Sequence, residues 1–251
     1  MIGTSLTIHA CRNRAIAYYE IQTGSPIRLT TRDSGLRVGE LDESGSLHAG
    51  QLLVDRARTD RFLRFTSGSD EPETVLRSIT PAADGSLTIV LATGSTSAAS
   101  GRSVLVLDET GDLLIDSNLA NNIESTFEPR ALFLPAMLSA GEEFVRPIRV
   151  QSEGNLFSSG SGEGTSTIRG IGIQLVEVPA GLYEAFVVES ELSFAIGPAR
   201  IVLTQRAWFA INRNGVGVVA EEGRELVRVF GIPAHNEKRV SVLAQEMIED
   251  E

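Results

Sequence analysis

The side chains that most often serve as general bases and metal ligands are few in this sequence and far apart along it. Its three histidines, His9, His48 and His235, lie in unrelated segments. None has a second histidine, cysteine or carboxylate at a metal-ligand spacing such as that of the HExxH motif. We interpret the histidines as solitary surface or core residues and predict no metal site. A hydrolase whose residues meet only in the folded chain, with His48 or His235 beside a carboxylate, is an open alternative.

Motifs for nucleophilic catalysis and cofactor binding are also missing from the sequence. A serine nucleophile elbow needs Ser between two glycines at a strand-to-helix turn, but Gly160–Gly164 reads GSGEG, with glycine at the serine position. Cys11, the one cysteine, lies beside Arg12 and close to Arg14, yet nothing supplies a positioned base, so we expect a buried structural thiol. The sequence has no GxxxxGKS/T phosphate loop and no GxGxxG that opens a βαβ unit. It therefore predicts no catalytic residue and no cofactor.

Acidic side chains are numerous, but their spacing fits neither a calcium loop nor a catalytic pair. The aspartates at positions 108, 112 and 116 miss the twelve-residue calcium pattern and its closing glutamate. Glu142–Glu143 and Glu221–Glu222 are sequence neighbours. Neighbours in a strand point to opposite faces of the sheet, so neither pair could act on one substrate. We expect solvated faces at both.

The composition excludes several classes of function. Asp and Glu number 33 against 22 Lys and Arg, and the resulting net charge of −11 repels nucleic acids. The densest basic segment, residues 55–64, contains four arginines that end with Arg64 and alternate with Asp55 and Asp60. We interpret this segment as a solvated strand face. No stretch approaches the ~18–20 consecutive apolar residues that span a bilayer. We therefore predict no nucleic-acid partner and no membrane span.

Short strands dominate the pattern of apolar residues. Leu87–Ala92, Leu192–Ile196 and Ile201–Arg206 have a period of two, which places successive side chains on opposite faces of a sheet. Asp84-Gly85 and Asn214-Gly215 separate such runs and favour tight hairpins. The 251 residues, 42% of them hydrophobic, can build a large core. We predict an all-β fold, a single large curled antiparallel sheet of the β-roll or open-barrel type that forms one domain over residues 1–251.

One or two short helices and two mobile loops are expected to interrupt this sheet. Asp116–Phe127 and Pro135–Leu138 could each hold a short helix, the second opened by its proline. Residues 93–103 and 154–170 are small and polar, and we expect mobile loops there because too little apolar area is available to offset ordering. The acidic tail from about residue 245 is expected to fray.

Three segments between residues 132 and 230 have the most individual sequence. They read LPAMLSAGEEF at Leu134–Phe144, QLVEVPAGLYEAFVVE at Gln174–Glu189 and RAWFAINRNGVGVVAEE at Arg206–Glu222. This succession resembles uncharacterised bacterial cell-envelope proteins built on one curled antiparallel sheet, which are distantly similar to the Lol-type lipoprotein carriers. The resemblance implies structural roles for a turn and a hairpin, namely Pro179, Ala180 and Gly181, and Trp208, Phe209, Gly215 and Gly217.

Carriers of this shape hold acyl chains in an apolar concavity, by dispersion and burial without fixed polar partners. The resemblance implies such a concavity in this chain as well. The candidate lining residues are Leu175, Phe186, Phe194, Leu203 and Trp208. Because the same side chains would also fill an ordinary core, a structural or interaction module with a filled core and no small-molecule site is the alternative.

The resemblance also implies a location in the periplasm or cell envelope. No signal peptide is visible at the start of the sequence, which leaves a cytoplasmic location open. Cys11 follows Ile8-His9-Ala10 as in a lipoprotein cleavage box, but the apolar segment that lipidation needs is missing, so we do not expect lipidation. We accordingly expect a non-enzymatic envelope-type β-domain that binds an apolar ligand or a partner envelope protein.

Overall fold

The computed structural model is built almost entirely from β-strands. It describes residues 28–52, 59–66, 72–82, 86–95, 98–120, 123–154, 159–210 and 217–247. Within these ranges lie sixteen strands and one short 3₁₀ helix, η1 (Ala49–Leu52). The predicted turns Asp84-Gly85 and Asn214-Gly215, as well as Cys11, lie outside the described residues.

The strands of the first half are short or of moderate length, and those of the second half are long. The first half contains β1 (Thr30–Thr31), β2 (Arg37–Asp42), β3 (Ser46–His48), β4 (Thr59–Thr66), β5 (Glu73–Pro81), β6 (Leu87–Ser95), β7 (Ala98–Leu107) and β8 (Leu113–Ala120). The second half contains β9 (Ile123–Leu134), β10 (Met137–Ser139), β11 (Glu143–Glu153), β12 (Gly160–Val178), β13 (Gly181–Ile196), β14 (Ala199–Phe209), β15 (Val218–Val229) and β16 (Ile232–Met247).

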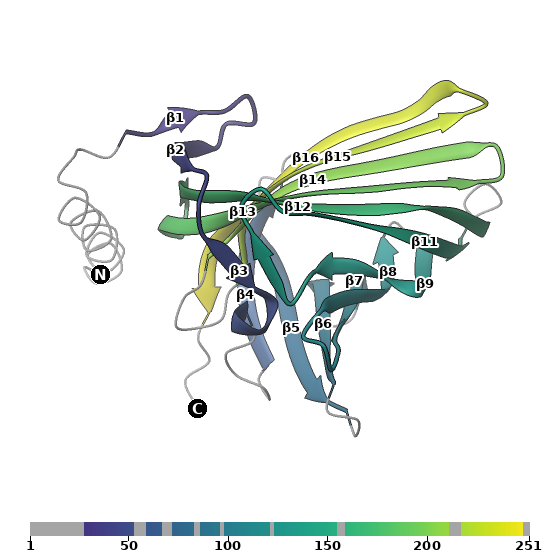
Figure 1. The fold of residues 1–251 in the computed structure, drawn as a ribbon, viewed down its shortest axis with the longest axis horizontal. Coiled ribbons are helices and arrows are strands. Elements are labelled where there is room, and N and C mark those ends of the chain that lie inside the picture. Colours follow the sequence, from purple (N-terminus) through teal and green to yellow (C-terminus); the bar gives the residue numbers. More distant parts are fainter. Residues whose placement is uncertain are drawn as a thin grey trace.

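Twelve of these strands form one antiparallel sheet that closes on itself. The order is β12-β11-β9-β8-β7-β6-β5-β4-β16-β15-β14-β13, and β13 pairs again with β12. Figure 1 shows the long strands β11–β16 as one layer and β5–β9 as a second layer below it in that view. The prediction of an all-β fold with one large curled antiparallel sheet is confirmed, and the pairing of β12 with β13 completes the ring.

The N-terminal strands attach to one edge of β12. This edge pairs with β11 along Gly160–Arg169 and with β2 along Ile173–Glu177. The hairpin of β1 and β2 therefore extends the sheet beyond the closed ring, while β3 pairs separately with β10. Among the described residues, no helix is long and apolar enough to cross a membrane.

The two predicted helices are wrong. Asp116–Phe127 lies in β8 and β9, apart from residues 121–122, and Pro135–Leu138 connects β9 to β10 and forms its start. Strand β8 pairs with β7 and β9 on its two edges, so its backbone groups find partners in other strands rather than in a helical turn. Pairing with distant strands thus overrides the local preference for a helix, which is weak in this polar segment.

Most of the two segments predicted to be loops is also strand. Residues 93–95 and 98–103 belong to β6 and β7, and residues 160–170 belong to β12. The glycines that favoured a loop have a packing role, because a Cβ atom at Gly162 would overlap the carbonyl oxygen of Ala195, and one at Gly164 that of Ser193. Glycine therefore allows β12 and β13 to approach closely. The acidic tail is predicted to fray from about residue 245. Strand β16 nevertheless continues to Met247 and pairs with β4 up to that residue.

Candidate functional site

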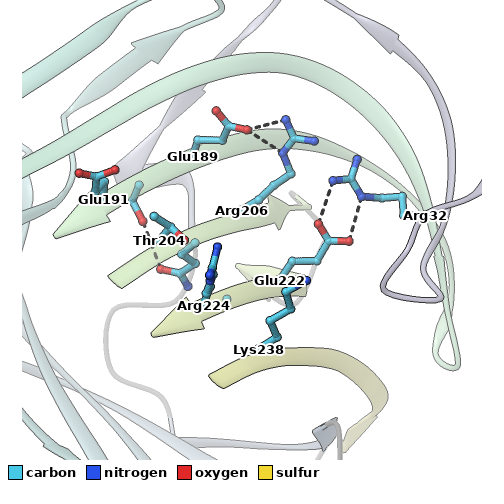
Figure 2. Close-up of a pocket in the computed structure, with 11 residues that line it drawn as sticks. Arg32, Glu189, Glu191, Thr204, Arg206, Glu222, Arg224 and Lys238 are labelled. Atoms are coloured by element: carbon cyan, nitrogen blue, oxygen red, sulfur yellow. Dashed lines mark hydrogen bonds and ion pairs between the residues drawn. The ribbon is translucent and has the colours of Figure 1, made fainter. Parts of the chain in front are cut away.

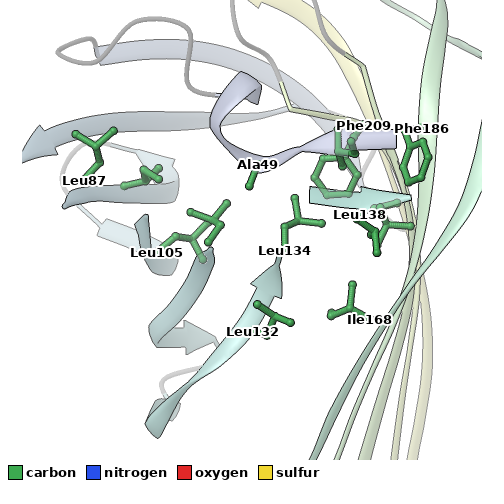
Figure 3. Close-up of a cluster of buried hydrophobic side chains, with 14 of the residues drawn as sticks. Ala49, Leu87, Leu105, Leu132, Leu134, Leu138, Ile168, Phe186 and Phe209 are labelled. Atoms are coloured by element: carbon green, nitrogen blue, oxygen red, sulfur yellow. The ribbon is translucent and has the colours of Figure 1, made fainter. Parts of the chain in front are cut away.

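The interior of the closed sheet contains the largest cluster of buried apolar side chains. It joins Leu87 and Leu105 on one side to Ile168, Phe186 and Phe209 on the other (Figure 3). The alternation of side chains along each strand directs these residues inward, as the period of two predicted. The cluster therefore joins the layer of β5–β9 to the layer of β12–β14.

Beside this cluster lies a cavity of about 70 Å³ with a mainly apolar wall. Its polar lining residues are Ser166, Ser190 and Gln205. Ser190 Oγ donates a hydrogen bond to Gln205 Oε1 at 3.3 Å, and Ser166 Oγ donates to the carbonyl oxygen of Leu132 at 3.3 Å. The apolar lining residues are Ile115, Leu132, Phe133, Ile168, Val188, Leu192, Ala207 and Phe209.

The five residues predicted to line a concavity do not meet at this cavity. Phe186 lies in the interior cluster, and Trp208 lies in a second cluster with Val187 and Val219. Phe194 and the partly buried Leu203 belong to a third cluster. Leu175 is buried with 7% of its surface exposed. None of the five lines the 70 Å³ cavity. Ligand contact by these five residues stays a prediction.

The predicted motif residues lie in the β12–β13 connection and in the Trp hairpin between β14 and β15. Val178 pairs with Gly181, so Pro179 and Ala180 form the two-residue turn between them. The Ala180 amide donates to the carbonyl oxygen of Leu243 at 3.2 Å. Gly217 accepts a hydrogen bond from the Ala210 amide at 3.0 Å, whereas Gly215 lies outside the described residues.

A polar groove of about 500 Å³ lies on the opposite face of β13–β15 (Figure 2). Its charged side chains alternate along the strands with residues that face the interior. Arg32 donates two hydrogen bonds to the Glu222 carboxylate, at 2.8 and 2.9 Å, and Ser34 Oγ also donates to Glu222. Arg206 donates to Glu189 through Nε at 3.0 Å and through Nη2. Two ion pairs therefore neutralise four of the charges that line the groove.

Trp208 connects the groove to the second cluster. Its side chain is fully buried, and its indole N–H donates to Gln174 Oε1 at 3.0 Å. Gln174 Nε2 in turn donates to the carbonyl oxygen of Gly39 at 2.9 Å. The Arg32 guanidinium lies over the indole at 5.6 Å from its ring centre. These contacts hold the β1–β2 hairpin against β12 and β14.

Among the described residues, one group of three could hold a metal ion. Glu225, His235 and Glu237 place one ligand atom each within 4.8 Å of one another. Glu225 lies opposite Glu237 in the β15–β16 ladder, and His235 follows on the same face. Arg239 occupies the Glu237 carboxylate with a hydrogen bond at 2.7 Å and thereby lowers the pKa of Glu237. The ladder register that forms this group cannot be read from the sequence.

The alternative of a hydrolase, with His48 or His235 beside a carboxylate, has only one weak candidate site among the described residues. His235 Nε2 lies 3.2 Å from Glu237 Oε2, but both side chains are exposed on a strand. His48 is exposed in β3. Neither histidine lines the polar groove or the apolar cavity. This arrangement does not place a base against an enclosed substrate.

The predicted acidic pairs act as structural partners. Glu143 accepts hydrogen bonds from Arg169, and Glu142 accepts one from the Ser139 amide at 2.7 Å. Glu222 faces the polar groove, while Glu221 lies on the other face, beside Ser241 and Ala207. The prediction that neighbouring glutamates point to opposite faces is confirmed at this pair.

The aspartates at positions 108–116 have partners of the same kind. Asp108 Oδ1 accepts hydrogen bonds from the amides of Thr110 and Asp112 and stabilises the β7–β8 turn. Asp112 accepts from Arg146 at 2.8 Å, and Asp116 accepts from Arg130 at 2.7 Å. These carboxylates are thus engaged in turns and ion pairs rather than gathered around one point.

Arg64 corrects the interpretation of residues 55–64 as a solvated strand face. Its Nε and Nη2 atoms are buried, and neither has a hydrogen-bond partner in the described structure. Burial lowers the pKa of Arg64, and the charge of Glu221 opposes that shift. The period of two could have placed Arg64 on one face of a strand, but only the closure of the sheet makes that face the interior.

Searches against family models and against curated proteins found no match. Among solved structures, the chain is similar to a protein described as exported, with a YmcC-like fold, from Bacteroides fragilis, at 12% identity and a TM-score of 0.45, covering 75% of this chain and 95% of that one. It is similar to a protein described as a lipoprotein from Parabacteroides distasonis, at 10% identity and a TM-score of 0.45, covering 76% and 96%. It is also similar to the hypothetical lipoprotein YmcC from Escherichia coli, at 9% identity and a TM-score of 0.41, covering 77% and 90%. With TM-scores below 0.5, these likenesses carry no inference about function.

Proposed function

We propose that this protein is a non-catalytic binding protein of the cell-envelope type, which holds the apolar part of a ligand inside its closed sheet. The observation that carries the proposal is the interior cavity. Eight of its eleven lining residues are apolar, and the three polar ones lie together on neighbouring strands. Ligand pockets commonly combine an apolar wall with a few polar groups that fix orientation.

The other polar features of the molecule fit binding better than catalysis. In the polar groove, Arg32 and Arg206 are engaged by Glu222 and Glu189 and are not free to activate a substrate. Glu237, whose carboxylate lies next to His235, is exposed and forms an ion pair with Arg239. A general base needs a positioned partner at a site that excludes water, and neither arrangement supplies one.

The size of the cavity limits what it could hold. A volume of 70 Å³ is about half that of an engineered 150 Å³ cavity that binds benzene. We expect a short segment of an aliphatic chain, with about 0.8 kcal/mol gained for each methylene group that is buried. Such a segment would lie against Val188, Leu192 and Phe209.

Filling the cavity tests the proposal. Ala207 is 4% exposed and lines the cavity, so Ala207→Met should occupy the space that a ligand would use. We expect the affinity for decanol, measured by calorimetry, to fall at least tenfold. The milder variant Ala207→Val provides a second measurement if the methionine variant unfolds. Ala195→Met, at an exposed position of β13, is the matched control and should bind decanol as the unmodified chain does. Equal affinity of all four proteins would contradict the proposal.

Contact with a partner protein stays a second prediction from the sequence. Its best candidate surface is the turn between β15 and β16, where Phe230 is 83% exposed and Ile232 is 69% exposed. Phe230 also has a positive φ of 51°, which is uncommon for a bulky residue. Single exposed apolar residues are common on protein surfaces, so this turn carries less weight than the cavity.

A further inference from the structure

The inner surface of the closed sheet has two chemically different walls. Starting from the cavity, a row of cross-strand neighbours runs from Val188 through Ala207 to Glu221, Ser241 and Thr66. The row is apolar on β13 and β14 and becomes polar on β15, β16 and β4. Among the residues of these last strands whose side chains the structure describes, five charged ones lie on the inner face: Glu221, Glu225, Glu237, Arg239 and Arg64.

The strand register places Arg64 on this inner face from both sides. Arg64 pairs with Leu243, which is fully buried and lies two residues from Ser241 on the same face of β16. On its other side Arg64 pairs with Glu73, and the same face of β5 carries Val75 and Ile79, both buried. Ile79 belongs to the interior cluster, whereas Leu243 and Val75, which lie nearer to Arg64, belong to the second cluster with Trp208. The Arg64 side chain therefore points into the closed sheet.

Arg64 differs from the other inner arginine whose partner is described. Arg239 donates to Glu237, whereas Arg64 Nε and Nη2 are buried and have no hydrogen-bond partner in the described structure. Arg64 interacts with Glu221 through charge alone. A buried guanidinium with two orphaned donors is costly, and native proteins rarely leave such groups without a water, ion or ligand.

An anion would satisfy this group better than water. Water could accept the two hydrogen bonds, but it would leave the positive charge in a poorly solvated position. A carboxylate or phosphate accepts both bonds in the fork geometry of the guanidinium and also supplies the opposite charge.

We propose that Arg64 is the anion site of the interior and that the ligand is an anionic amphiphile, with its carboxylate or phosphate at Arg64 and its apolar chain in the cavity between β9 and β12–β14. This inference rests on the proposed function, because it assumes that the cavity binds an apolar group. Three strand spacings separate β14 from β4, which corresponds to roughly 14 Å along the sheet. The ligand thus needs a chain that reaches from one wall to the other.

Four probes separate the anion site from apolar binding: decanoate, decyl phosphate, decanol and inorganic phosphate, each titrated into the full chain by calorimetry. We expect decanoate and decyl phosphate to bind about tenfold to hundredfold more tightly than decanol, which is what a charge-assisted hydrogen-bond pair contributes. Inorganic phosphate should bind at least tenfold more weakly than decyl phosphate. Equal binding of phosphate and decyl phosphate would overturn the assignment of an amphiphile, since a free anion would then suffice.

Arg64→Met tests the residue itself. The variant should bind both anionic probes only as tightly as decanol and should leave the affinity for decanol unchanged. Arg64→Lys, which keeps the charge and loses the fork, should lie between the two. Arg149→Met is the matched control, because Arg149 is 64% exposed and paired with Glu163. An unchanged preference for anions in Arg64→Met would overturn the proposal.

The stability of the ligand-free variant gives an independent readout. Because the methionine removes a buried guanidinium with two unsatisfied donors, the melting temperature of Arg64→Met should equal or exceed that of the unmodified chain. A lower melting temperature, or a chain that does not fold, would mean that Arg64 has a structural partner and would contradict the proposal. If no probe with an alkyl chain binds the unmodified protein, the proposed function itself fails. If decanol binds as tightly as decanoate and decyl phosphate, only the anion site fails.

Discussion

Gln174 connects three parts of the molecule through one side-chain amide. Its Oε1 accepts the indole N–H of Trp208 at 3.0 Å, and its Nε2 donates to the carbonyl oxygen of Gly39 at 2.9 Å. Both bonds are buried, and Trp208 has no exposed surface. We predict that Gln174→Met, which keeps the length of the side chain but removes the amide, destabilises the protein far more than an average substitution.

The magnitude follows from the groups that methionine would leave behind. The thioether is a weak acceptor and donates nothing, so the Trp208 N–H loses a strong partner and the Gly39 carbonyl loses a donor. A buried polar group without a partner costs about 1–3 kcal/mol. We expect the two together to lower the free energy of unfolding by about 2–4 kcal/mol, a large share of the ~5–15 kcal/mol of a typical domain.

Urea denaturation measures this loss directly. Trp208 is the only tryptophan, so its fluorescence reports the surroundings of the altered bond as well as global unfolding. The control is Gln151→Met on β11, where the side chain is exposed and the expected change is within about 0.5 kcal/mol. If Gln174→Met costs no more than this control, the amide does not satisfy Trp208 and the reasoning is refuted.

Two further predictions concern strand packing and acid stability. Gly164→Ala should cost about 1–3 kcal/mol in urea denaturation, because its Cβ would overlap the Ser193 carbonyl oxygen, whereas Gly50→Ala meets open space and should be nearly neutral. The hydrogen bond from Arg239 lowers the pKa of Glu237 below its usual 4.5, so its stabilising effect exists above that value and disappears as the pH falls through the lowered pKa. Arg239→Gln should therefore lose less stability than the unmodified chain between about pH 5 and pH 3 in thermal melts. If the melting temperatures of Arg239→Gln and the unmodified chain fell equally over this pH range, the prediction would be contradicted.

The sequence was informative where a strand is apolar on one face and polar on the other. Leu87–Ala92, Leu192–Ile196 and Ile201–Arg206 all lie in strands, since side chains in a strand alternate between two faces. Composition was misleading at Gly160–Gly164, where small residues indicated a loop. Their small size is required by the close approach of β13, which depends on a partner strand and not on local sequence.

The site was harder to predict than the fold because the faces of the strands exchange at bulges. A register shift between Gly170 and Gly172 leaves Ile171 as an extra residue in β12, and the shift opposite Trp208 and Phe209 leaves Val219 as an extra residue in β15, so both strands change which positions face the interior. Phe186 pairs with Phe209 and faces the interior cluster, while Trp208, predicted to line the same concavity, pairs with Val187 and lies in a separate cluster. The sequence does not give the register between β13 and β14, and this register decides that Phe186 and Trp208 lie on opposite faces.

The polar wall of the interior depends on the pairing of β4 with the last strand, β16. Strand β4 meets β16 with Arg64 opposite Leu243, and a shift of one residue would turn Arg64 outward and Phe65 inward. That alternative would solvate the guanidinium and bury an aromatic ring, which ordinary stability favours. The register instead keeps a guanidinium inside the sheet, with two buried donors that have no hydrogen-bond partner in the described structure. A local cost that the rest of the fold over-determines is characteristic of functional sites, and at Arg64 the missing element is an acceptor for two buried donors.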